Sequence, residues 1–242
     1  MSLPGFAQFS PLHVSYLLTW LALWIVVPTL GARVLSAAQQ KHAATGLAVI
    51  TVVQELVDYL NRIAVRDLSL AVDLPLQFCH LAQIFSVLLV FFRIPILFET
   101  TYFWGLAGAL QAMLTPDLNA FNNHLGLFLF FLHHGLLILI VLWLIFVSGY
   151  RCRRWAVPRI FLLTNLIMIP VAFVDWLTDA NYMYLRASPV TNSPFISGPW
   201  PWYLVQLELI GVVMMSLLQL PMSLARRKQS NRMQPFNPEK TA

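Results

Sequence analysis

Residues 124–148 read HLGLFLFFLHHGLLILIVLWLIFVS, a run without Asp, Glu, Lys or Arg. About 20 mostly apolar residues make one membrane-spanning helix, so this run is long enough to cross a bilayer. The whole chain of 242 residues has the same character, since 59% of its residues are hydrophobic and only 10% are charged. A soluble domain typically carries about 25% charged residues. The composition therefore excludes a soluble enzyme, a secreted disulfide scaffold and a disordered regulator.

Hydropathy along the chain predicts an all-α fold, a polytopic membrane protein built as a bundle of seven transmembrane helices. With a window of about 19 residues, the predicted spans lie near 12–32, 43–65, 72–92, 94–115, 124–148, 158–179 and 201–225. We expect one transmembrane domain over residues 1–225 and a basic cytoplasmic tail over residues 226–242. The N-terminal residues lack a basic region and a cleavage site, so we expect no signal peptide.

The distribution of basic residues predicts how this bundle is oriented. With the N-terminus outside, 12 of the 15 Lys and Arg residues fall in cytoplasmic segments, and Arg62, Arg66 and Arg186 remain outside. The positive-inside rule then predicts N-out and C-in. The net charge of +5 is therefore explained by topology, with anionic lipid as the partner of the basic tail and no nucleic acid.

Ionisable residues recur on one helical face in several predicted spans, although each costs about 2.5–3.5 kcal/mol in lipid. On the second span this face carries Thr51, Glu55, Asp58 and Arg62. Similar stripes on the sixth and seventh spans include Asp175 and Glu208. Most of these groups lie in the outer half of their spans, which indicates a polar interior that opens toward the outer leaflet. The alternative is that the charges of the second span simply neutralise one another.

Cys79 and a pair of histidines lie at similar depths in this predicted bundle. Cys79 is about 10 Å below the outer end of the third span, and His133 and His134 are about 14 Å below that of the fifth. A thiol in hydrocarbon is inert unless a base activates it, and histidine is the usual base. These positions indicate a Cys–His pair, whereas packing roles for both residue types are the alternative.

Metal binding by the histidines and carboxylates is a further alternative, but no HxxxH or ExxH spacing occurs, so we predict no metal site.

Five motifs follow one another along the chain: LPLQFC at 74–79, FWGLAGALQAMLTPDL at 103–118, HHG at 133–135, LTDANYMYL at 177–185 and GPWPWY at 198–203. Over nearly all of residues 10–222 they resemble the YwaF-like bacterial integral membrane proteins, which are related to mammalian transmembrane protein 164. The resemblance implies a seven-helix bundle. From the mammalian relative it also implies a phospholipid acyltransferase that uses a membrane-embedded cysteine and histidine.

The resemblance carries over to individual positions of this chain, namely Cys79, His134 with its extra neighbour His133, Glu55, Glu208 and His124. One departure is Gln77, where the family motif LPLHLC has a histidine, so the function would be weakened here or rerouted through His80. A second departure is Ser188, where relatives tend to have lysine.

We therefore predict an acyltransferase of the cell membrane, in a bacterial inner membrane, that acts on phospholipid or lysophospholipid through Cys79 and His134. Supporting or substrate-binding roles are predicted for Glu55, Asp58, Gln77, Gln111, His124, His133, Asp175 and Glu208. An acyl-thioester formed from a donor lipid needs no cofactor, and a homo-oligomer is compatible with the sequence. The alternatives are a lipid hydrolase of the same geometry, a transporter or receptor without enzymatic activity, and a scaffold for another membrane protein.

Overall fold

The computed structural model describes residues 6–116, 123–188 and 198–232, and this part of the chain folds into seven α-helices and one short 3-10 helix. The helices are α1 (Pro11–Val34), α2 (Ala37–Val65), α3 (Phe78–Phe91), α4 (Pro95–Leu114), α5 (His124–Phe146), α6 (Ala156–Thr178), η1 (Tyr182–Tyr184) and α7 (Trp202–Arg232). The predicted all-α fold with seven helices is thus confirmed.

Five of these helices, α1, α2, α5, α6 and α7, are long and apolar enough to cross a membrane. The chain is therefore a multi-pass membrane protein, whereas seven crossings and the N-out, C-in orientation stay predictions. The helix in the third predicted span begins at Phe78, later than the expected start at 72. Residues before it form a turn in which the Ser69 carbonyl accepts hydrogen bonds from the amides of Val72 and Asp73, and Pro75 comes two residues later. A window average of hydropathy does not resolve such a turn.

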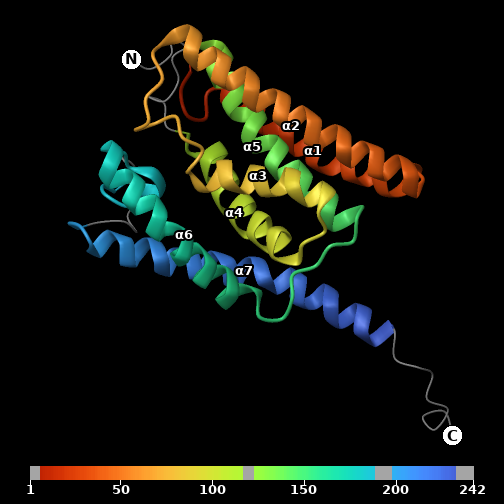
Figure 1. Ribbon diagram of the computed structural model, residues 1–242. Helices are drawn as coiled ribbons and strands as arrows, with labels where there is room; N and C mark the ends of the chain where they lie inside the picture. Colours follow the sequence, from red (N-terminus) through yellow and green to blue (C-terminus); the bar gives the residue numbers. More distant parts are fainter. Residues whose placement is uncertain (1–5, 117–122, 189–197, 233–242) are drawn as a thin grey trace, which may run out of the picture.

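Helix α5 is the centre of the bundle, because it packs against α1, α2, α3 and α4. Of its 23 residues, 15 are buried. A helix that is apolar all round suits this central position. Figure 1 shows α1, α2 and α5 side by side, with α6 and α7 on the other side of α4. Helices α6 and α7 contact each other and α4.

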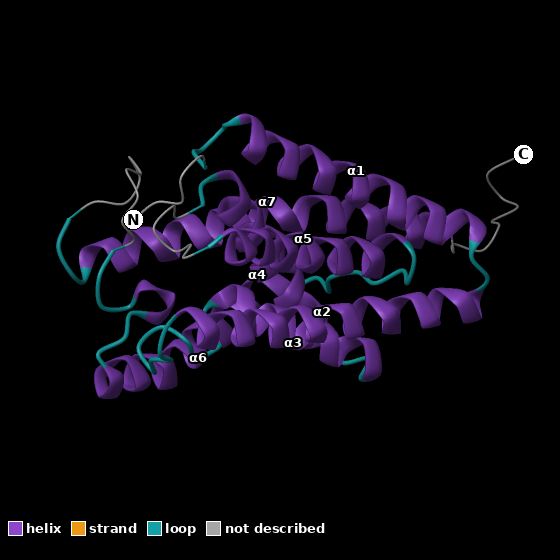
Figure 2. Cartoon of the chain, turned by 90° about the horizontal axis from the view of Figure 1, so that it is seen from above, coloured by secondary structure: helices purple, strands orange, loops and turns teal. Residues whose placement is uncertain are grey.

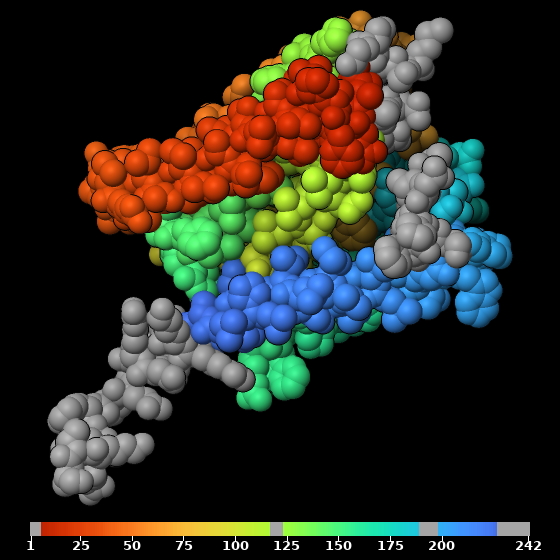
Figure 3. Space-filling model, turned by 180° about the vertical axis from the view of Figure 1, so that it is seen from behind, coloured from red at the N-terminus to blue at the C-terminus, as the bar shows by residue number. Residues whose placement is uncertain are grey.

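The outer helices present apolar side chains to their surroundings, as expected of helices that face lipid. Exposed examples are Leu18 and Ile25 on α1, Leu56 on α2, Ile169 on α6 and Leu209 on α7. Seen from the side shown in Figure 3, α1 and α7 lie across the surface, and parts of α4 and α5 are visible between them. The start of α1 and the end of α7 lie at opposite ends of the bundle (Figures 1 and 2). This arrangement agrees with an odd number of crossings.

Close contact between α1 and α5 depends on Gly135, the last residue of the HHG motif. A Cβ atom at this position would lie within 3 Å of three atoms of the Trp20 ring. The neighbouring Trp24 donates a hydrogen bond of 3.0 Å from Nε1 to the Gly135 carbonyl. The missing side chain of Gly135 therefore lets two tryptophans of α1 pack directly beside the histidine pair.

Candidate functional site

A cluster of Glu55, His80 and His133 lies where α2, α3 and α5 meet, and each helix contributes one residue. His133 Nδ1 is 3.3 Å from Glu55 Oε2, and His80 Nε2 is 3.7 Å from Glu55 Oε1. The two imidazole rings are 4.9 Å apart between centroids. One potential metal-ligating atom from each residue lies within 4.8 Å of the others. We call these three residues the Glu–His cluster.

A polar contact between α2 and α3 fixes the position of the Glu–His cluster. Gln83 Nε2 donates a hydrogen bond of 2.9 Å to Gln54 Oε1, and both side chains are buried. Gln54 directly precedes Glu55, and Gln83 lies three residues after His80 on α3. Since a buried amide pair must keep its partners, this bond sets the register of the two helices.

Cys79 is the second residue of α3 and directly precedes His80. A Cβ atom at Gly108 of α4 would stand 3.2 Å from Cys79 Sγ, so the glycine lets the thiol pack closely against α4. The His133 ring lies beside the Cys79 backbone carbonyl, but its Nε2 makes no hydrogen bond of normal geometry. The cysteine backbone and the Glu–His cluster are therefore direct neighbours.

His134 is buried and is oriented by its own helix. Its Nδ1 is 2.8 Å from the Phe130 carbonyl oxygen, and its ring packs on Phe130 with 4.3 Å between centroids. A carbonyl only accepts hydrogen bonds, so Nδ1 carries the proton in this contact and Nε2 keeps its lone pair. The ring of His134 also contacts that of His133, with centroids 4.9 Å apart. His134 therefore has the tautomer that a general base requires.

The other charges predicted on the face of Glu55 form a separate ion network at the end of α2. Asp58 Oδ2 pairs with Arg62 at 2.6 Å, and Arg62 and Arg66 both contact Asp73 in the loop that precedes α3. Hydrogen bonds from Arg66 hold the pKa of Asp73 at about 2, well below its usual range. Mutual neutralisation thus describes Asp58 and Arg62, whereas Glu55 is directed toward the histidines.

Asp175 and Glu208, on α6 and α7, have partners outside the Glu–His cluster. Asp175 is buried and accepts a hydrogen bond of 2.9 Å from the Tyr182 amide of η1. Glu208 Oε2 accepts one of 3.3 Å from Asn165 Nδ2, which joins α7 to α6. These contacts join α6 to η1 and to α7.

The remaining predicted residues lie at helix ends. Gln77 Oε1 accepts a hydrogen bond of 3.0 Å from the Met183 amide, so it ties the start of α3 to η1. Gln111 is exposed and bonds to Thr115 at the end of α4. His124, the first residue of α5, is exposed. The structure therefore does not bring these three side chains to Cys79 through any contact that it describes.

Glu99 is an important polar residue that the sequence did not single out. It is fully buried in α4 and accepts hydrogen bonds from Arg153 Nε at 2.9 Å and from Arg159 at 2.5 Å. The amide of Arg153 also donates to it, at 2.8 Å. The signal was present, because a carboxylate inside a predicted span needs a partner and the basic run RCRRW follows α5.

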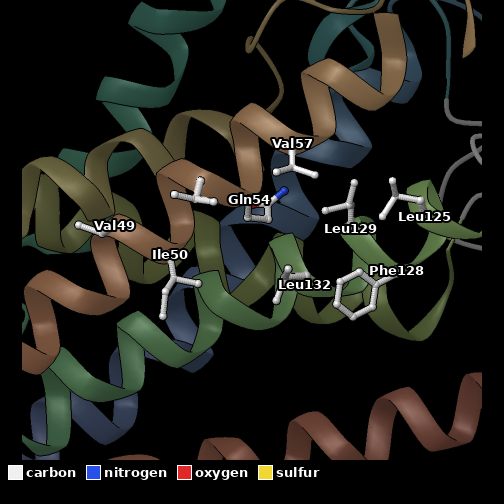
Figure 4. Close-up of a pocket in the computed structure, with 9 residues that line it drawn as sticks. Val49, Ile50, Gln54, Val57, Leu125, Phe128, Leu129 and Leu132 are labelled. Carbon is white, nitrogen blue, oxygen red and sulfur yellow. The ribbon is translucent and has the colours of Figure 1, made fainter. Parts of the chain in front are cut away.

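An apolar groove of about 330 Å³ lies between α2 and α5 (Figure 4). It is lined by Val49, Ile50, Val53, Gln54, Val57, Leu125, Phe128, Leu129 and Leu132. Gln54 adjoins Glu55 in the chain, and Leu132 adjoins His133. The groove therefore runs along the two helices that supply two members of the Glu–His cluster.

The fold and the site define an integral membrane protein of the multi-pass α-helical class, with a Glu–His cluster beside a cysteine among its central helices. The chain belongs to the TMEM164 family, which matches residues 8–219. The relation to transmembrane protein 164 predicted from the motifs is thus confirmed. Neither a curated protein nor a solved structure matches the chain.

Proposed function

We propose that this TMEM164 family protein is an acyltransferase of a bacterial inner membrane that moves a fatty acyl group between phospholipid and lysophospholipid. The observation that supports the proposal is that the Cys79 backbone carbonyl lies beside the ring of His133, which contacts the rings of His80 and His134. Thiol and imidazole are the groups that covalent acyl transfer requires.

In the proposed reaction, Cys79 is the nucleophile and His134 the general base. His134 Nε2 takes the thiol proton, Sγ attacks the ester carbonyl of the donor lipid, and the lipid alcohol leaves with the proton from the imidazolium. The hydroxyl of the acceptor lipid then loses its proton to His134 and attacks the thioester. The acyl group passes to the acceptor, and the thiol regains a proton. The hydrogen bond from Nδ1 to the Phe130 carbonyl supports this role, because it leaves Nε2 to accept the proton.

The apolar lining of the groove supports a lipid substrate. The groove between α2 and α5 is almost entirely apolar, which suits an acyl chain. With the proposed N-out, C-in orientation, the site lies in the outer half of the bilayer, and membrane phospholipid is its substrate.

The test uses the purified full-length protein in lipid nanodiscs with an isotope-labelled phospholipid and an unlabelled lysophospholipid. Mass spectrometry is expected to detect the label in the acceptor lipid. Cys79→Ser should lower this transfer by more than about 100-fold, and His134→Gln by about 100-fold to 10,000-fold. Cys152→Ser is the matched control, because Cys152 is the second free cysteine and lies in the loop before α6.

Three outcomes would contradict the proposal. Release of free labelled fatty acid without acyl-lipid product would identify a hydrolase. Transfer that persists in Cys79→Ser would exclude the cysteine as nucleophile. Absence of both products, together with solute uptake into proteoliposomes that survives Cys79→Ala, would favour a transporter.

A further inference from the structure

We propose that the Glu–His cluster is a binding site for a divalent transition metal ion, with Zn²⁺ as the ion that fits it best. The inference goes beyond the acyl transfer proposed above and does not depend on it. The ligands are Glu55 Oε1 or Oε2, His80 Nε2 and His133 Nδ1, which come from three different helices.

The two distances from Glu55 to the histidines are close to the spacing of tetrahedral zinc ligands. Zinc binds imidazole nitrogen and carboxylate oxygen at about 2.0–2.2 Å, so two tetrahedral ligands stand about 3.3 Å apart. Glu55 and His133 are 3.3 Å apart, and Glu55 and His80 are 3.7 Å apart. The latter distance is too long for a hydrogen bond, so His80 gains little from the carboxylate alone. All three candidate ligand atoms lie within 4.8 Å of one another, so an ion would bind all three after the farthest pair moved closer by up to about 1.5 Å.

Unpartnered polar atoms gather at this cluster. In the described part of the chain, seven buried side-chain N or O atoms have no hydrogen-bond partner, and three of them are Glu55 Oε1, His80 Nδ1 and His133 Nε2. Leaving such atoms without partners costs about 1–3 kcal/mol each. Of these three atoms, Glu55 Oε1 is one of the proposed ligand atoms, and a bound ion would give it a partner.

The donor set favours zinc chemistry over magnesium or calcium. Two imidazoles and one carboxylate suit Zn²⁺ and related first-row ions, whereas Mg²⁺ and Ca²⁺ prefer oxygen ligands. Three protein ligands also leave the fourth tetrahedral position open. The His133 ring also lies beside the Cys79 backbone carbonyl, and metal-bound histidines commonly face such an acceptor.

The charge and the exposure of the cluster allow a cation to enter. Glu55 supplies a negative charge, and the positive charge of Arg62 on the same helix is already paired with Asp58 and Asp73. The Glu55 and His80 side chains are 27% and 21% exposed, so the cluster lies near the molecular surface, although Glu55 Oε1 itself is buried.

The full-length protein is purified through a tag without histidines, incubated with Zn²⁺ and dialysed. Its metal content is then measured. Inductively coupled plasma mass spectrometry is expected to find about one Zn²⁺ per wild-type chain. Glu55→Gln, His80→Gln and His133→Gln should each raise the Kd for Zn²⁺ by more than about 100-fold. His42→Gln is the matched control, because His42 is an exposed histidine on the same helix as Glu55.

Zinc should also raise the Tm of the wild type and of His42→Gln, but not that of the three cluster variants. His80→Cys keeps a zinc ligand and is expected to retain binding, which separates loss of a ligand from loss of the fold. A folded wild type without bound Zn²⁺ would overturn the proposal, as would undiminished binding in all three variants. Cys79→Ser should keep its zinc, so failure of the acyltransferase proposal is distinguishable from failure of this one.

Discussion

Gly135→Ala should destabilise the bundle by about 2 to 3 kcal/mol, because α5 touches α1 at this glycine. Of the three Trp20 ring atoms that a new Cβ would meet, even the most distant, Cζ2, is only 2.5 Å away. Carbon atoms pack at about 3.5–4.0 Å, so the buried ring must move back by about 1 Å or more. Such overpacking costs about 1–3 kcal/mol. The hydrogen bond from Trp24 to the Gly135 carbonyl contributes about 1 kcal/mol more if it breaks.

The assay is unfolding of the purified protein in mixed micelles by SDS titration, followed by tryptophan fluorescence. Gly46→Ala on α2 and Gly211→Ala on α7 are the matched controls, because a Cβ there would meet nothing within 4 Å. Both should leave stability unchanged or raise it by up to about 1 kcal/mol, the ordinary gain of alanine over glycine in a helix. Gly135→Ala combined with Trp20→Ala should show a favourable coupling of at least about 1 kcal/mol. A Gly135→Ala protein as stable as Gly46→Ala would refute the reasoning.

Three further changes test other parts of the structure. Glu99→Gln should lower the free energy of unfolding by about 2 to 3 kcal/mol, measured in the same titration, because it leaves Arg153 and Arg159 without a buried carboxylate. Tyr182→Phe should cost about 1 to 2 kcal/mol, since the Tyr182 hydroxyl donates to the Leu70 carbonyl at 2.9 Å and accepts from the Leu74 amide at 2.8 Å. Asp73 has a lowered pKa of about 2 in the folded protein, so its contribution is present above pH 4 and is lost as the pH falls toward 2. Thermal unfolding between these pH values should therefore show a loss of stability that Asp73→Asn abolishes.

The sequence predicted the elements of the bundle because each depends on its own apolar run. The most apolar run became α5, the most buried helix among the candidate spans. The face shared by Asp58 and Arg62 was also correctly placed, since an ion pair at i,i+4 follows from helical geometry alone. The start of α3 at Phe78 was not predicted, because it depends on a turn and on the contact of Gln77 with Met183, 106 residues away.

The Glu–His cluster could not be predicted from ligand spacing, because that spacing describes ligands on one helix. Glu55 and His133 are 78 residues apart, and His80 comes from a third helix. Their meeting depends on how α2 and α3 pack against α5. The sequence nevertheless singled out Glu55 on a polar face of the second span, His133 beside His134, and His80 beside Cys79, but not the contact among them.

The HHG motif gains a physical explanation from the directions of its three side chains. Successive residues of a helix point about 100° apart, so three neighbours on α5 face three different parts of the bundle. His133 faces Glu55, His134 is held against Phe130, and Gly135 receives Trp20. Because the glycine sets how closely α1 packs beside α5, a larger residue there would also displace the two histidines that precede it. One short segment therefore links the stability of the helix packing to the geometry of the site.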